Sequence, residues 1–147
     1  VQSALKAARE RGIPTLLVTS QPGHPGLADL VLLLETGAEV LAGSTRLKAA
    51  TAAKCALNAL TTGAMAQLGR IYNNLMVEVR PTNKKLRGRA ASLIERLGQV
   101  NTERSFDLLD QCDGDVKQAI VCARNGVSPE LAKETLDSCD RRLREVL

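Results

Sequence analysis

The clearest pattern of apolar positions lies in residues 44–68, where leucines and alanines recur every three or four residues. This spacing predicts one long helix, which at about 1.5 Å per residue would run to roughly 40 Å. Apolar side chains occupy more than one side of it, which indicates a central helix or a helix that contacts another subunit. A shorter helix is predicted over residues 2–11, where Gly12 is a typical stop.

Two apolar segments between these helices predict strands. Residues 15–20 (TLLVTS) and 29–35 (DLVLLLE) are continuous apolar runs, which are typical of strands covered on both faces in a parallel sheet. The short loop at 21–26 leaves the relative direction of the two strands open. Because two strands alone do not form such a sheet, we expect further strands upstream or from elsewhere. The absence of an initiator Met supports that expectation.

The last part of the chain reads as a small helical bundle. Residues 71–79 form a connector of strand-like composition, which Pro81 ends. The apolar spacing predicts helices over residues 82–97, 102–112, 115–125 and 129–146. The last of these opens with Ser128 as its N-cap and Pro129 in its first turn.

Composition limits the kind of partner. The chain has 147 residues, of which 44% are hydrophobic, and its aromatic residues are Tyr72 and Phe106. The core must therefore be aliphatic. A net charge of +4 suits an anionic ligand without requiring nucleic acid, and a single-strand binder would need aromatic platforms. The sequence contains no signal peptide and no run of about 18 apolar residues, so we expect no membrane span.

The cysteines and the single histidine do not predict a metal site. Four cysteines occur without a CxxC pair. Cys55 lies in an alanine-rich stretch and reads as a small buried hydrophobe, and we expect reduced thiols in a cytoplasm. His24 lies in the proline-containing loop. A plain solvent-exposed residue is the simpler interpretation, and a residue that lines a ligand pocket is the alternative.

The start of the long predicted helix has an unusual charge pattern. Gly43, Ser44 and Thr45 precede Arg46 and Lys48, although the N-terminus of a helix disfavours cations. A bound phosphate would resolve this, because free backbone N–H groups, hydroxyls and a glycine that permits close approach are the groups that bind one. The alternative is that Ser44 is an ordinary N-cap and that both cations are solvated.

The sequence around this helix resembles a known family. Residues 37–90 contain the linked elements GAEV, GSTRLK, LNALTTGAM and NLMVEV. In combination they resemble the C-terminal half of N-acetylmuramic acid 6-phosphate etherases, which belong to the sugar-isomerase (SIS) domain superfamily. The similarity extends over nearly the whole chain. The family more often has Met, Gly and Gln at the positions of Leu47, Ala50 and Ala53.

The resemblance implies a fold class, α/β, and a lyase activity. Residues 1–80 would be the C-terminal part of a doubly wound parallel-sheet SIS domain. Residues 81–147 would be a helical domain similar to ubiquitin-associated domains. The family eliminates the D-lactyl ether of N-acetylmuramic acid 6-phosphate and adds water, giving N-acetylglucosamine 6-phosphate and D-lactate. The resemblance implies a cytoplasmic homodimer that uses no metal or organic cofactor.

The resemblance also implies where the phosphorylated amino sugar binds. It places Ser44 and Thr45 beside the sugar phosphate, with Lys48 as a further contact. Glu39 lies near this turn, and we include it among the substrate-binding residues without a catalytic role. The acid and the base that the elimination needs lie upstream in the family. We therefore expect this chain alone to be inactive.

Two other interpretations stay open. One is a non-catalytic phosphosugar-binding regulator, similar to the glucokinase regulatory protein of animals, which shares the architecture and a hydroxyl-rich turn. The other starts from the basic residues between Arg80 and Arg96, which are compatible with nucleic acid or a membrane surface. The solvated face of an amphipathic helix explains them more simply, so we expect neither partner.

Overall fold

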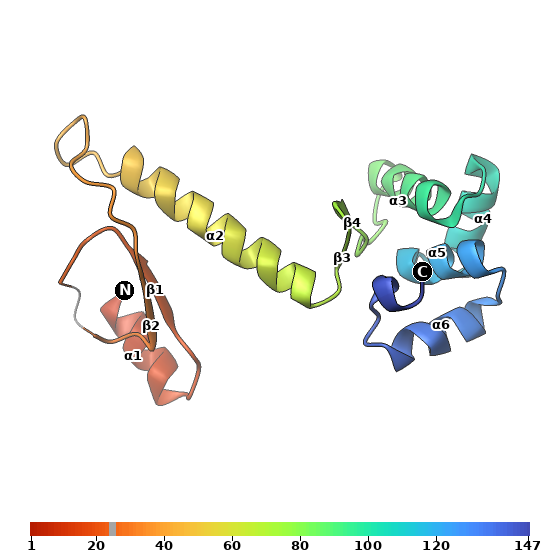
Figure 1. The fold of residues 1–147 in the computed structure, drawn as a ribbon, viewed down its shortest axis with the longest axis horizontal. Coiled ribbons are helices and arrows are strands. Elements are labelled where there is room, and N and C mark those ends of the chain that lie inside the picture. Colours follow the sequence, from red (N-terminus) through yellow and green to blue (C-terminus); the bar gives the residue numbers. More distant parts are fainter. Residues whose placement is uncertain (24–25) are drawn as a thin grey trace. The chain divides into compact units, whose positions relative to one another are not determined.

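The computed structural model describes residues 1–23 and 26–147, which form two compact units, Val1–Thr62 and Gly63–Leu147 (Figure 1). The first unit contains α1 (Gln2–Glu10), β1 (Leu16–Thr19), β2 (Leu30–Leu33) and most of α2 (Lys48–Gln67). The second contains β3 (Ile71–Tyr72), β4 (Leu75–Met76), α3 (Lys84–Gly98), α4 (Thr102–Gln111), α5 (Val116–Asn125), α6 (Pro129–Ser138) and a short 3-10 helix (Leu143–Glu145). The predicted mixed α/β class is confirmed.

β1 and β2 form a parallel pair and lie side by side in Figure 1. The register pairs Leu16 with Leu30 and Thr19 with Leu33. Beside the start of both strands, the Asp29 carboxylate accepts hydrogen bonds from the N–H and the hydroxyl of Thr15, at 2.8 and 2.7 Å. These bonds hold the two strands at this end. The strand direction, which the short loop left open, is parallel, as the resemblance implies.

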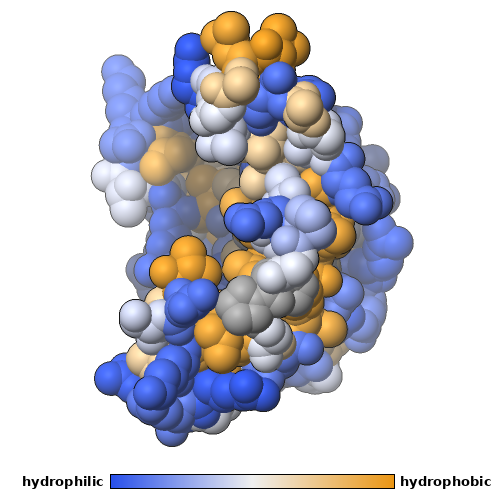
Figure 2. Space-filling model, turned by 90° about the vertical axis from the view of Figure 1, so that its left-hand side faces the viewer, coloured by the Kyte–Doolittle hydropathy of each residue, from blue (hydrophilic) through white to orange (hydrophobic). Residues whose placement is uncertain are grey.

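The first unit has little core of its own. None of the described residues within 1–62 is buried, and Leu30 on β2 is 68% exposed. Leu57 and Leu60 on α2 are exposed as well. Cys55, predicted to be buried, is also exposed. Figure 2 shows apolar side chains open to solvent on the face turned to the viewer. Contiguous apolar surface of this kind is typical of surfaces that another element covers.

The long helix starts later than predicted. α2 begins at Lys48 rather than at residue 44, and residues 45–47 form a turn before it. Ser44 is therefore not its N-cap. The Ser44 carbonyl instead accepts a hydrogen bond from the N–H of Leu47 at 3.2 Å, within that turn.

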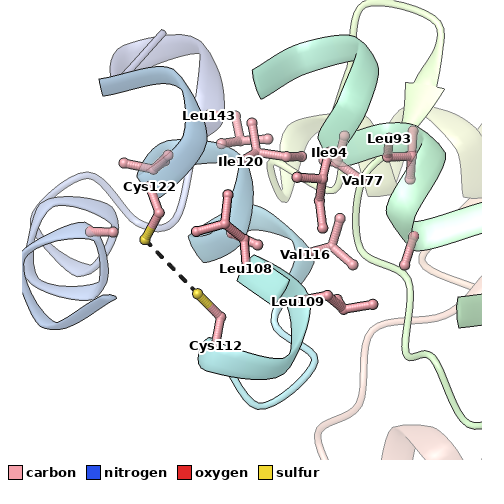
Figure 3. Close-up of a cluster of buried hydrophobic side chains, with 14 of the residues drawn as sticks. Val77, Leu93, Ile94, Leu108, Leu109, Cys112, Val116, Ile120, Cys122 and Leu143 are labelled. Carbon is pink, nitrogen blue, oxygen red and sulfur yellow. Dashed lines mark hydrogen bonds between the residues drawn. The ribbon is translucent and has the colours of Figure 1, made fainter. Parts of the chain in front are cut away.

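The second unit is a helical bundle around an aliphatic core, as the composition predicts. α5 packs against α3, α4 and α6. Val77, Ile94, Leu109 and Ile120 are at most 1% exposed. Figure 3 shows these side chains converging from α3, α4, α5 and the segment before α3.

Polar side chains cap the starts of the four α-helices α3 to α6. Each accepts a hydrogen bond from a backbone N–H three residues further on, which satisfies one of the free donors of the first turn. The caps are Asn83, Asn101, Asp115 and Ser128. The predicted cap at Ser128 is confirmed.

The predicted helix over residues 129–146 is too long. α6 ends at Ser138, because Asp140 and Arg141 have φ angles of 51° and 57°. Left-handed residues do not continue a right-handed helix. The Arg141 side chain pairs with Asp115 and Asp137, and these contacts hold the break in place.

The predicted connector at 71–79 contains a hairpin. β3 and β4 pair antiparallel around Asn73 and Asn74, and Asn73 has a φ of 52°. Asparagine tolerates this left-handed conformation better than most residues. Val77 and Val79 then extend from the hairpin into the core.

A largely buried ion pair attaches this extended segment to the bundle. The Lys117 Nζ lies 2.8 Å from Glu78 Oε2 and 3.0 Å from the carbonyl oxygen of Arg141. The Lys117 side chain is 3% exposed and that of Glu78 43%. Burial, the largest single influence, would raise the pKa of Glu78. The hydrogen bond and charge of Lys117 and the nearby Arg70 and Arg141 together lower it instead.

Glu78→Gln should lower the free energy of unfolding by about 1–3 kcal/mol, because it leaves the buried Lys117 ammonium without an opposite charge. The effect is smaller than for a fully buried pair because Glu78 is partly exposed. Asp110→Asn is the matched control. It breaks the exposed Arg87–Asp110 pair, which should be worth about 1 kcal/mol or less. Urea unfolding followed by circular dichroism measures both, and equal losses would contradict this account.

Gly98 is needed for packing rather than for ending α3. The C-cap is Gln99, with a φ of 59°, and a Cβ on Gly98 would overlap with the Cβ of Ala123 on α5. Gly98→Ala should therefore destabilise the chain by about 1–3 kcal/mol. Gly88→Ala is the control on the same helix, where a Cβ meets nothing within 4 Å, and it should stabilise by about 0.5–1 kcal/mol. Unfolding curves in which both variants shift the same way would refute the packing role.

Candidate functional site

A pocket of about 460 Å³ lies at the carboxyl ends of β1 and β2, within the first unit. Residues after β1, residues after β2 and the start of α2 form its walls. They include Thr19, Ser20, Gln21, Thr36, Gly37, Glu39, Thr45, Ala49, Ala50 and Ala53. The carboxyl ends of parallel strands are where open α/β sheets bind ligands. This pocket is therefore the candidate ligand site.

Glu39 fixes the start of α2 beside this pocket. Its Oε1 accepts a hydrogen bond from the N–H of Ala49 at 3.0 Å, and its Oε2 accepts one from the N–H of Lys48 at 2.9 Å. The bond from Ala49 lowers the pKa of Glu39 most, followed by the bond from Lys48. The positive charge of Lys48 lowers it further. An internal carboxylate thus occupies the positive end of the helix dipole. This is the physical reason why the helix starts at Lys48.

The cations at the helix start are explained in part by the same carboxylate. The Lys48 ammonium turns back towards the loop that carries Glu39, 4.0 Å from where a Cβ on Gly37 would lie. Its positive charge is one of the influences that lower the pKa of Glu39. Arg46 is exposed. The sequence suggested either a bound anion or a Ser44 cap at this helix start. The structure instead places there the carboxylate of Glu39, nine residues before Lys48.

The four residues predicted to bind substrate are not equivalent in the structure. Thr45 and Glu39 line the pocket, whereas Ser44 and Lys48 are not part of its described wall. The Ser44 N–H donates to the carbonyl of Leu41 at 3.0 Å. The structure thus brings all four to one turn, and their contact with a substrate stays a prediction.

Sequence reasoning missed the hydroxyl residues that follow the strands. Thr19 and Ser20 end the TLLVTS run, and Thr36 comes three residues after β2. The Thr19 hydroxyl oxygen accepts a hydrogen bond from the N–H of Gln21 at 3.1 Å, a bond that does not use the hydroxyl proton. The signal was present, since polar residues directly after parallel strands meet at one edge of a sheet.

The described residues add little about other candidates. His24 lies outside them. Within residues 1–23 and 26–147, His, Cys, Asp and Glu side chains form no group of three that would hold a metal ion. The same residues include no helix with the length and apolar character needed to cross a bilayer.

The parallel strand pair, the pocket at its carboxyl ends and the capped helix beside it place a candidate ligand pocket in a mixed α/β arrangement. No family model matches the chain. It is 44% identical over 149 residues to an N-acetylmuramic acid 6-phosphate etherase of Synechocystis, an alignment that covers 100% of this chain and 49% of the relative. The etherases of Rubrobacter xylanophilus and Thermobifida fusca are 45% and 47% identical. Those alignments cover 90% and 83% of this chain, and 45% and 41% of the relatives.

Over its whole length the chain is similar to the C-terminal half of N-acetylmuramic acid 6-phosphate etherases. It spans about half the length of the curated relatives it matches. The resemblance first seen in residues 37–90 is therefore confirmed over the whole chain.

Protonation of Glu39 should release the start of α2. Its pKa is lowered from the ordinary 4.5, so the cap is complete above that value and is lost as the pH falls through the lowered pKa. In an amide NMR titration, the Lys48 and Ala49 signals should therefore shift with an apparent pKa below 4.5. Glu39→Gln should abolish this shift and Glu35→Gln should leave it. A shift that persists in Glu39→Gln would show that another group caps the helix.

Proposed function

We propose that the chain is the C-terminal part of a lyase that cleaves the D-lactyl ether of N-acetylmuramic acid 6-phosphate. The products would be N-acetylglucosamine 6-phosphate and D-lactate. The observation that carries the proposal is the pocket at the carboxyl ends of β1 and β2. The whole chain that contains this pocket aligns with about half the length of relatives that are named as etherases. Their names favour the etherase over a non-catalytic regulator.

The donors available in the pocket suit a phosphate ester. Two N–H groups of the first turn of α2 are already bonded to Glu39, so the ester would bind mainly through hydroxyl groups. Thr45, Thr19, Ser20 and Thr36 line the pocket with such groups. In this proposal Ser44 and Lys48 complete the contact when the turn closes on the substrate.

Glu39 is poorly suited to act as the base of the elimination. Both of its oxygens accept backbone hydrogen bonds, and its pKa is lowered. A general base for removing a proton beside a carbonyl works best with a pKa near the working pH. Glu39 would therefore position the turn, while the catalytic acid and base come from the half of the relatives that this chain does not match. No residue described above is assigned catalysis.

The proposed enzyme also gives the exposed apolar surface a role. Residues 1–80 would complete the doubly wound sheet of an SIS domain, with the other half of the protein covering β1, β2 and α2. Residues 81–147 would be a structural, ubiquitin-associated-like domain. We propose a cytoplasmic homodimer that needs no cofactor and binds neither nucleic acid nor membrane.

The double substitution Ser44→Ala and Thr45→Val should weaken binding of the sugar phosphate by about 1–3 kcal/mol, the scale for losing hydrogen bonds to a charged group. Thr61→Val is the matched control, because its hydroxyl is bonded to the carbonyl of Leu57 on the same helix. Both affinities are measured by calorimetric titration of a polypeptide that contains this chain together with the N-terminal half present in the relatives. Unchanged affinity in the double variant, with an intact fold, would exclude this turn as a contact.

The activity itself is tested by D-lactate release from N-acetylmuramic acid 6-phosphate. We expect D-lactate release by the complete polypeptide, which joins this chain to the N-terminal half present in the relatives, and no release by this chain alone. Sugar-phosphate binding without any release by the complete polypeptide would point to the regulator instead.

A further inference from the structure

Two buried thiols face one another in the core of the second unit. Cys112 caps the end of α4 and Cys122 lies in α5, and their Sγ atoms are 3.9 Å apart. The residues are 3% and 4% exposed. Figure 3 shows both side chains pointing towards each other across the gap between the two helices.

The other two cysteines have different surroundings. Cys55 is exposed on α2. The Cys139 thiol is engaged with backbone carbonyls, at 3.4 Å from Thr135 and 3.3 Å from Leu136. Among the described residues, the two thiols in contact with one another are those of Cys112 and Cys122. The geometry thus pairs two particular thiols out of four.

We propose that Cys112 and Cys122 are a latent disulfide pair, which hydrogen peroxide converts into an intrachain disulfide. One thiolate attacks the peroxide, the O–O bond breaks, and a sulfenic acid forms with release of hydroxide. The second thiol then displaces water from that sulfur as the S–S bond forms. In sum, two thiols and one peroxide give one disulfide and two water molecules. A thiol reductant reverses the change.

The movement required is small and falls at an adaptable place. A disulfide needs a sulfur separation of about 2.05 Å, so the two atoms must approach by roughly 2 Å. Cys112 is outside the regular helix, with φ −99° and ψ 19°, and the turn after it includes Asp113 with a φ of 51°. In the proposal, the short turn that joins α4 to α5 takes up this shift.

Burial makes the reaction slow in the native state. It raises the pKa of Cys112 to about 12 and also raises that of Cys122, and the thiolate is the reacting form. Oxidation therefore requires a transient opening of the α4–α5 contact. The pair should react more slowly than Cys55, and its rate should rise with pH and with subdenaturing urea.

The test uses the full chain carrying Cys55→Ser and Cys139→Ser, so that only the proposed pair remains. After peroxide treatment and blocking of free thiols, trypsin cuts after Arg104, Lys117 and Arg124, which separates the two cysteines. The expected product is a peptide 105–117 joined to peptide 118–124, lost on addition of dithiothreitol. Adding Cys122→Ala supplies the matched control, in which the joined peptide cannot form.

Two comparisons decide the proposal. In the chain with all four cysteines, the 112–122 link should dominate over other intrachain links when the protein is folded, and lose that preference in guanidinium chloride. Equal link frequencies in the folded and unfolded chains would overturn the proposal. So would oxidation of either thiol to a sulfinic acid without the joined peptide, or disulfides only between chains.

Discussion

The carboxylate of Glu39 on the first turn of α2 is the interaction on which the candidate site depends. It supplies the negative charge that a helix N-terminus favours, and it decides that the helix begins at Lys48. The turn at 45–47 is left outside the helix as a consequence, which brings Thr45 to the pocket wall. One internal hydrogen-bonded contact therefore places the helix, the turn and the pocket together.

The two units of the chain differ in how far they bury their apolar side chains. The second unit buries Ile94, Leu109 and Ile120 between its own helices, and a polar side chain caps the start of each of α3, α4, α5 and α6. The first leaves Leu30 and much of α2 exposed. A continuous apolar strand is stable only when both of its faces are covered. The first unit therefore presents apolar surface that its own residues do not cover, whereas the second unit buries its apolar side chains itself.

These physical differences explain which elements the sequence predicts well. The caps of α5 and α6 are local signals, because the capping side chain lies three residues from the N–H it accepts, and both helix starts were predicted closely. The start of α2 depends on Glu39, which is distant in the sequence, so a local pattern of hydroxyls was misleading. The break at Asp140 and Arg141 likewise depends on Asp115 from another helix. Thr45, which the sequence singled out, lines the pocket, whereas Thr19 and Thr36 line it as well and were not singled out.

The occupied helix end also limits how an anion can bind. In many phosphate sites the ester takes the free N–H groups of the first turn directly. Here Lys48 and Ala49 donate theirs to Glu39, and displacing that carboxylate would leave a negative charge beside the ester. An ester in this pocket is better stabilised by hydroxyl donors from the strand ends and by a Lys48 side chain that turns from Glu39 towards the ligand. The proposed site would thus separate two tasks: the carboxylate of Glu39 orders the turn, and the hydroxyl groups would recognise the ester.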